Sequence, residues 1–304
     1  FWLKLSSRYC IVYRTPSLGG GVAAGCGIRE RSFPGPNLSK MAYVGELVSG
    51  GLQLLPGQQK VDHADFGSDL STDFGSDHSD CEGVVGEDDG VEAPTFAADD
   101  TLLILDWDDT LLPTSWIEAQ GLGVANWSAA VSGAQRAQLD LMAERAALTL
   151  RVAKSFGRVI IVTNAEHGWI EMSCKKFMPS LWQALEDVKA LSARSVYERQ
   201  GVMQPGVWKL LAFRGEIDRV FGVGAKGGFG GGPQRNIVSV GDSLHEREAL
   251  IRVTECCPNS WAKVLKLMEK PTAEEFLKEH EVLCSVLGDI VNHEGNLDVS
   301  LCSP

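Results

Sequence analysis

The chain has 304 residues, of which 44% are hydrophobic and 22% charged, and these proportions are ordinary for a soluble protein with one sizeable domain. The formal net charge of -12 is a local feature, because residues 61–100 hold 13 of the 40 acidic side chains and no Lys or Arg. The rest of the chain is nearly neutral and has no uninterrupted apolar run of transmembrane length, so we expect neither general nucleic-acid binding nor a membrane partner.

The first 40 residues contain six basic residues and one acidic residue, with several Ser and Gly. This pattern is typical of an organelle-targeting leader that lacks its own start. The alternative is that Met41 is the true start and that upstream or fragmentary sequence precedes it. We therefore treat residues 1–56 as a leader or a poorly ordered segment. The expected compartment is the cytoplasm, or an organelle if residues 1–40 are a leader.

Residues 57–100 are rich in Asp, Gly and Ser and contain a perfect repeat, Asp65–Asp69 and Asp73–Asp77. Few large apolar side chains are present, so the segment cannot bury enough surface to offset its ordering entropy. We expect a disordered acidic linker. The alternative is a tail that docks on a protein partner through Phe66 and Phe74.

From residue 101 to residue 304, short apolar runs alternate with stretches of helical periodicity, which predicts an α/β domain. Runs that are apolar throughout indicate strands of a parallel sheet covered on both faces, and hence a Rossmann-like three-layer α/β/α fold. Thr272 and Glu275 have the spacing of a capping box at a helix start. The expected strands are 102–105, 159–162, 188–191, 237–240 and 261–267, and the expected helices are 127–155, 168–187, 206–214 and one opened by residues 271–272.

Polar side chains follow the first of these strands directly. The sequence there reads Asp106-Trp-Asp108-Asp-Thr110, and two carboxylates at i and i+2 converge only where the backbone turns sharply. The string alone is a weak signal, because acidic surface loops are common. Its position behind a buried strand strengthens it, since such sheets bind ligands at the carboxyl ends of their strands.

Two further strand ends carry polar groups suited to a phosphate and a cation. Thr163 and Asn164 offer a hydroxyl and an amide that can hold a phosphate oxygen. Gly241 allows a tight turn, Asp242 can meet a cation, and Glu246 lies one helical turn further on. Each of these pairs is also found without function, so the prediction depends on their convergence.

Taken in order, these segments resemble the motifs of the haloacid dehalogenase superfamily over about 200 residues. The resemblance implies that Asp106 is a nucleophile that becomes an aspartyl phosphate. It implies that Asp108 is the general acid and base, with a backbone carbonyl that binds the metal. Thr163 matches the second motif, and Asp242 the acidic fourth motif with Glu246 as a supporting carboxylate. Thr110 and Gly241 are supporting residues of the same motifs.

The family also uses a lysine that neutralises the phosphate and the nucleophile. Lys209 is our choice, because it lies near the start of a predicted helix before the last motif. Lys189 falls in a predicted strand and Lys226 in a Gly-rich loop, so both fit the role less well.

The expected metal set is Asp106, Asp108 and Asp242, and it requires a cation for a physical reason. Carboxylates about 4 Å apart repel by roughly 4 kcal/mol per pair at an effective dielectric constant near 20, so one of them would stay protonated without a counter-ion. Mg²⁺ suits the site, since it takes one or two carboxylates, keeps several waters and shares the substrate phosphate.

The resemblance therefore implies a Mg²⁺-dependent phosphomonoester hydrolase. Asp108 favours phosphatases and phosphomutases over family members that lack this residue. Only 57 positions separate Asp106 from Thr163 and 46 separate Thr163 from Lys209, so a large cap domain does not fit. Family members without caps have open sites and often act on macromolecules such as phosphoproteins. We therefore expect a phosphorylated substrate that is either a small molecule or a phosphoprotein. The alternatives are a phosphomutase and a catalytically silent binding or regulatory protein.

Overall fold

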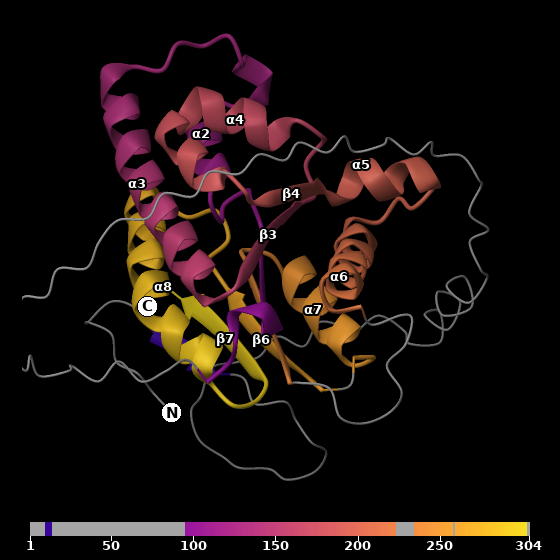
Figure 1. Ribbon diagram of the computed structural model, residues 1–304. Coiled ribbons are helices and arrows are strands. Elements are labelled where there is room, and N and C mark those ends of the chain that lie inside the picture. Colours follow the sequence, from indigo (N-terminus) through magenta and orange to yellow (C-terminus); the bar gives the residue numbers. More distant parts are fainter. Residues whose placement is uncertain (1–9, 14–94, 223–233, 258, 303–304) are drawn as a thin grey trace, which may run out of the picture. The chain divides into compact units, whose positions relative to one another are not determined.

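The computed structural model describes residues 10–13, 95–222, 234–257 and 259–302, all of which belong to one compact unit (Figure 1). Its centre is a seven-stranded sheet of order β1-β7-β6-β5-β2-β3-β4. Six strands are parallel, and β1 pairs antiparallel with β7 at one edge. The strands are β1 (Cys10–Tyr13), β2 (Thr101–Leu105), β3 (Arg158–Thr163), β4 (Lys189–Ser192), β5 (Arg235–Gly241), β6 (Ser260–Lys266) and β7 (Leu297–Cys302).

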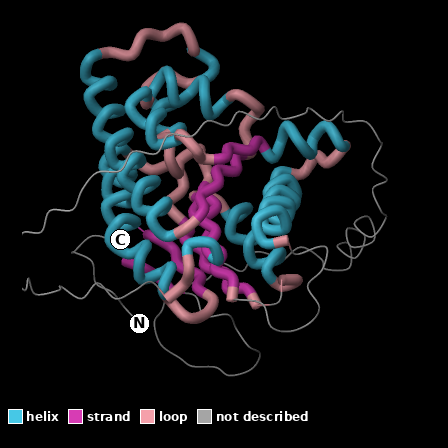
Figure 2. Tube along the Cα trace, in the orientation of Figure 1, coloured by secondary structure: helices cyan, strands magenta, loops and turns pink. Residues whose placement is uncertain are grey.

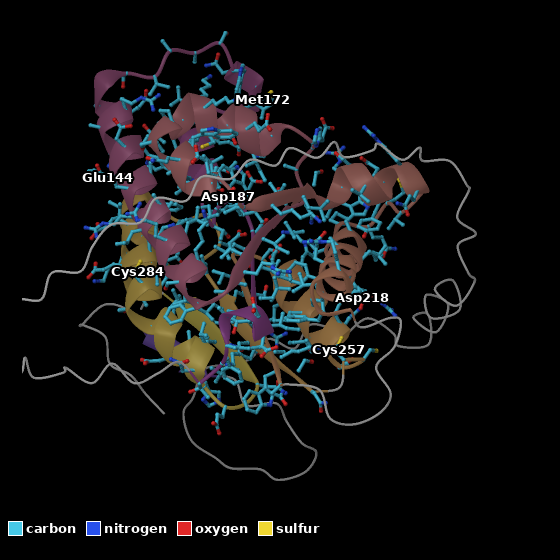
Figure 3. The ribbon with its side chains drawn as sticks, in the orientation of Figure 1. Glu144, Met172, Asp187, Asp218, Cys257 and Cys284 are labelled. Carbon is cyan, nitrogen blue, oxygen red and sulfur yellow. The ribbon has the colours of Figure 1, made fainter. Side chains whose placement is uncertain are left out.

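Helices cover both faces of this sheet and give the three expected layers (Figure 2). Helices α2, α3, α4 and α8 pack on one face, and α5, α6 and α7 pack on the other. In Figure 3 the labels of Glu144 and Cys284 mark the first layer, and those of Asp218 and Cys257 mark the second. The helices are α2 (Thr114–Ala119), α3 (Gly133–Phe156), α4 (Trp169–Phe177), α5 (Ala193–Tyr197), α6 (Pro205–Phe221), α7 (Leu244–Thr254) and α8 (Ala273–Asn292).

The α/β class and the parallel sheet confirm the fold expected from the sequence. Every residue of β2 is buried, because helices lie on both faces and no side chain of the strand meets solvent. Helix α8 begins at Thr272 with the expected capping box to Glu275, and α3 begins with a second one between Ser132 and Gln135.

The strand order explains where a site can form. Strand β2 lies between β3 and β5, so the chain leaves β2 toward one side of the sheet and returns on the other. At such a switch point the loops after adjacent strands diverge and leave a crevice outside their carboxyl ends. A site at β2 would therefore be bordered by the segments that follow β2, β3 and β5.

Several element boundaries differ from the sequence prediction. The helices expected within 168–187 are α4, which ends at Phe177, and a 3-10 helix, Pro179–Leu185, where Pro179 lacks the N–H that would continue the α-helix. Further 3-10 turns are Ala98–Asp100, Val124–Asn126 and Glu198–Gln200. Helix α3 begins at Gly133 instead of 127, helix α6 runs on to Phe221 instead of 214, and strand β7 was not predicted.

The boundaries expected at the amino-terminal end also need correction. Cys10–Tyr13, assigned to the leader or poorly ordered segment, forms β1 against β7. Phe96, assigned to the disordered linker, is buried and packs edge-to-face on Trp261 with ring centroids 5.3 Å apart. The aromatic contact explains why the domain begins before residue 101. The rest of the expected leader and linker lies outside the described residues.

The expectation that no large cap is present can be compared with residues 95–222, which the structure describes without a gap. No part of this range forms a compact unit of its own. Over the described residues, no helix combines the length and the apolar character needed to cross a membrane.

Candidate active site

Hydrogen bonding between β2 and β5 brings the first and third motifs together. Leu105 pairs with Val240, and the N–H of Asp106 donates to the carbonyl of Val240 at 2.9 Å. Asp106 therefore extends the β2–β5 ladder by one residue, and the turn after Gly241 places Asp242 beside it. The convergence predicted from the sequence follows from this register.

Asp106, Asp242 and Glu246 form an acidic cluster in which one oxygen of each lies within 4.8 Å of the others. Asp106 and Glu246 are buried, and Asp242 is partly exposed. Hard oxygen donors at this mutual separation are the ligands that Mg²⁺ and Ca²⁺ take in proteins. The cluster can hold a metal ion.

Lys209 lies inside the cluster and is 1% exposed. Its Nζ donates to Asp106 Oδ1 at 2.6 Å, to Glu246 Oε1 at 2.8 Å and to the carbonyl of Val162 at 2.6 Å. Lys209, chosen from the sequence, thus contacts Asp106, the expected nucleophile. Because an ammonium group has three donors and all three are engaged, a phosphate would contact Lys209 only in place of one of these acceptors.

The two other lysines considered for this role differ. Lys189 is bound to Glu216 at 2.5 Å, on α6. Lys226 lies outside the described residues.

Burial sets the electrostatics of the cluster. Burial raises the pKa of Asp106 well above its ordinary value in spite of the attraction of Lys209, and Glu246 and Asp108 act in the same direction. Burial, with the charges of Glu246 and Asp109, raises the pKa of Asp242 to about 7. The single charge of Lys209 therefore does not balance the carboxylates around it. The metal-free cluster takes up protons instead, and a divalent ion would displace these protons on binding.

The pKa values of Lys209 and Glu246 shift in the directions that keep both charged. Burial alone would lower the pKa of Lys209, but Asp106 and Glu246 outweigh it and raise that pKa. Burial alone would raise the pKa of Glu246, but Lys209 and Ser243 hold it below its ordinary value. Each member of the pair therefore favours the charged form of the other.

Glu246 is held by two neighbours at the start of α7. Its Oε2 accepts hydrogen bonds from the N–H of Ser243 at 3.1 Å and from the Ser243 hydroxyl, which completes a capping box. A Cβ on Gly241 would lie 2.6 Å from Glu246 Cγ. Glycine is needed at 241 because Glu246 packs against its backbone, which differs from the tight turn expected from the sequence.

The acidic cluster contains the carboxylate of Glu246 and not that of Asp108. The expected metal contact of Asp108, through its backbone carbonyl, stays a prediction. Asp108 Oδ1 accepts from Thr114 Oγ1 at 2.6 Å and from Trp169 Nε1 at 2.8 Å. Asp108 Oδ2 accepts from Thr163 Oγ1 at 3.3 Å. Three neutral donors thus hold the Asp108 carboxylate, whereas Asp106 is held by the cation of Lys209.

The second motif contacts Asp108 and α6. The hydroxyl of Thr163 donates to Asp108 Oδ2 and accepts from the N–H of Ala165 at 2.9 Å. Asn164 Nδ2 donates to the carbonyl of Pro205 at 3.2 Å, and Asn164 Oδ1 is buried without a partner. Nδ2 carries a second N–H besides the one that binds Pro205, so the expected phosphate contact of Asn164 stays a prediction. Asn164 also ties the β3 loop to the start of α6.

Lys266 and Asp109 lie near the site and were not predicted from the sequence, and Thr110 has other contacts than expected. Lys266 Nζ donates to the carbonyl of Asp242 at 2.7 Å and so holds the turn after β5. Asp109 has a φ of 49° and accepts from the Ser115 N–H at 2.8 Å and from its hydroxyl, which anchors the start of α2. The hydroxyl of Thr110, expected to support the motif, is buried and has no hydrogen-bond partner.

No protein-family model, curated protein or solved structure matches the chain. The resemblance to the haloacid dehalogenase superfamily therefore depends on the motifs and on the geometry described above.

Proposed function

We propose that this protein is a Mg²⁺-dependent phosphomonoester hydrolase of the haloacid dehalogenase type, acting through an aspartyl phosphate on Asp106. One observation carries the proposal. Two aspartates at i and i+2 have opposite surroundings: Asp106 lies in an acidic cluster with a buried lysine, and Asp108 lies among neutral donors outside it. Carboxylates that the fold separates in this way are suited to different steps of one reaction.

The cluster supports Mg²⁺ as its ion, because its donors are carboxylate oxygens and no Cys or His belongs to the group of ligands. Asp106, Asp242 and Glu246 would hold the ion. When bound, Mg²⁺ supplies positive charge that offsets the charge of the transferring phosphoryl group.

The residues then have defined tasks. A carboxylate oxygen of Asp106 forms a bond to phosphorus while the bond from phosphorus to the ester oxygen breaks. Protonated Asp108 gives its proton to that departing oxygen, so the product is an alcohol. In the second half, Asp108 takes a proton from water as the water oxygen attacks phosphorus, which releases phosphate and restores Asp106. Lys209 holds Asp106 in place through its hydrogen bond at 2.6 Å, and its charge together with that of the bound ion favours the ionised form of Asp106.

The test is hydrolysis of a panel of sugar phosphates, nucleotides and phosphopeptides with Mg²⁺. We expect the wild type to release phosphate from at least one class, and Asp106→Asn to lose at least about a hundredfold in rate. Asp140→Asn, on the surface of α3, is the matched control and keeps wild-type activity.

The other outcomes identify the alternatives. A wild type that is as inert as Asp106→Asn across the whole panel contradicts hydrolysis and favours a binding protein. Transfer of the phosphoryl group to a hydroxyl of a second substrate molecule, in preference to water, identifies a phosphomutase.

A further inference from the structure

The hydrogen bonds to Asp108 are distributed unevenly over its two oxygens. A carboxylate oxygen has about two acceptor positions. On Oδ1 both are filled, by the hydroxyl of Thr114 at 2.6 Å and the indole N–H of Trp169 at 2.8 Å. On Oδ2 one is filled, by Thr163 at 3.3 Å. A proton on Asp108 therefore has room on Oδ2 and none on Oδ1.

Trp169 is suited to hold this arrangement through a catalytic cycle. An indole N–H only donates and does not titrate, so it cannot exchange roles when Asp108 gains or loses a proton. The Thr114 hydroxyl can rotate, and its hydrogen bond alone would not fix the carboxyl orientation. Trp169 thus provides the directional constraint on Oδ1.

The position of the indole is fixed by the segment between the two motif aspartates. Trp169 is the first residue of α4, after Gly168 in the left-handed conformation at φ 87°. Its carbonyl accepts from Ser173 Oγ at 2.6 Å, and Ser173 Oγ accepts from Trp107 Nε1 at 3.0 Å. Trp107 lies between Asp106 and Asp108 and is fully buried. The motif loop and α4 are therefore linked twice, through Trp107 and through Asp108.

We propose that Trp169 is a positioning residue, which occupies Oδ1 of Asp108 and so assigns the transferred proton to Oδ2. This inference rests on the proposed function, because it concerns proton delivery by Asp108. It predicts a loss that depends on the leaving group. An alkoxide needs the proton of Asp108 in order to depart, whereas 4-nitrophenolate departs without it.

The experiment compares Trp169→Phe with wild type on 4-nitrophenyl phosphate and on an alkyl phosphate, using kcat/KM, which covers the step in which the leaving group departs. We expect kcat/KM to fall about tenfold or more for the alkyl phosphate and less than about threefold for 4-nitrophenyl phosphate. Trp169→Leu also removes the indole N–H and replaces Trp169→Phe if that variant does not fold. Thr114→Val leaves Trp169 on Oδ1, so its loss for the alkyl phosphate should be smaller than that of the Trp169 variants, and an equal loss would contradict the inference.

The matched control is Trp127→Phe. The Trp127 ring packs on Trp169 with centroids 5.9 Å apart and has no contact with Asp108. We expect equal changes, if any, for both of its substrates. Equal losses on both substrates for Trp169→Phe, or the same leaving-group dependence in Trp127→Phe, overturn the inference. A wild type that hydrolyses neither substrate contradicts the proposed function itself, which is a distinct result.

Discussion

Replacement of Lys209 by Met tests the electrostatics of the site without any substrate. The change removes the one cation that contacts both Asp106 and Glu246, at 2.6 and 2.8 Å, and keeps most of the apolar stem. At these distances and an effective dielectric constant of 20, each pair attracts by about 6 kcal/mol when both partners are charged, before the cost of desolvation. In the metal-free site the raised pKa of Asp106 weakens the Asp106 pair, so the Glu246 pair contributes most. Breaking a buried pair by removing one partner costs about 3–5 kcal/mol.

We therefore expect Lys209→Met to lower the free energy of unfolding in EDTA by about 3–5 kcal/mol near neutral pH. The loss should shrink as the pH falls, because Asp106 and Glu246 can then take up protons in place of the missing cation. Mg²⁺ should also restore part of the stability, since it binds the folded cluster. Urea denaturation with EDTA or with Mg²⁺ measures these differences.

Lys189→Met is the matched control. Lys189 forms a pair with Glu216, but its side chain is 42% exposed, and such a pair contributes less than about 1 kcal/mol. If Lys209→Met costs no more than Lys189→Met in EDTA, the carboxylates around Lys209 are not charged as described, and the electrostatic reasoning is wrong.

Three further predictions follow from individual residues. Burial lowers the pKa of His280 to about 3, so between about pH 6.5 and 3 the unfolded chain binds a proton that the folded chain does not. On acidification His280→Gln should therefore lose less free energy of unfolding than the wild type, by at most about 5 kcal/mol. Equal losses in thermal melts at acidic pH would contradict this. Gly241→Ala should destabilise the fold by about 1–3 kcal/mol because the new Cβ meets Glu246, while Gly133→Ala, which meets nothing within 4 Å, should not, and chemical denaturation compares them. Because Asp242 binds a proton below about pH 7, calorimetry should find Mg²⁺ affinity about tenfold higher near pH 8 than near pH 6; an unchanged affinity would show that Asp242 is not a ligand.

Much of the fold could be predicted from the sequence, since its strongest signals are local. The strand before Asp106 is apolar at every position, and only a parallel sheet covered on both faces buries such a strand completely. By contrast, β7 (Leu297–Cys302) is only partly buried, and its partner β1 lies near the other end of the chain. No local pattern indicates a pairing between segments so far apart.

The candidate site, like the fold, could be predicted from the sequence only in part. The order of the strand ends indicates which residues meet, and the sequence alone brought Asp106, Lys209 and Asp242 together. The direction of each carboxylate depends on side chains elsewhere. The carboxylate of Asp108 is bound by Trp169, 61 positions away, and lies outside the cluster. The carboxylate of Glu246 can lie in the cluster because Gly241 has no side chain. Such contacts depend on packing and could not be read from motif spacing.

The most direct test of the aspartyl-phosphate mechanism is to trap the intermediate. Asp108→Asn lacks the base that activates water, so the phosphoryl group should remain on the enzyme after Mg²⁺ and 4-nitrophenyl phosphate are added and the mixture is quenched with acid. Mass spectrometry of the peptides should find one phosphoryl group on Asp106 and none in the Asp106→Asn, Asp108→Asn double variant. A phosphoryl group on another residue, or steady hydrolysis by the wild type with no phosphorylated Asp106 in the trapping variant, would contradict the mechanism.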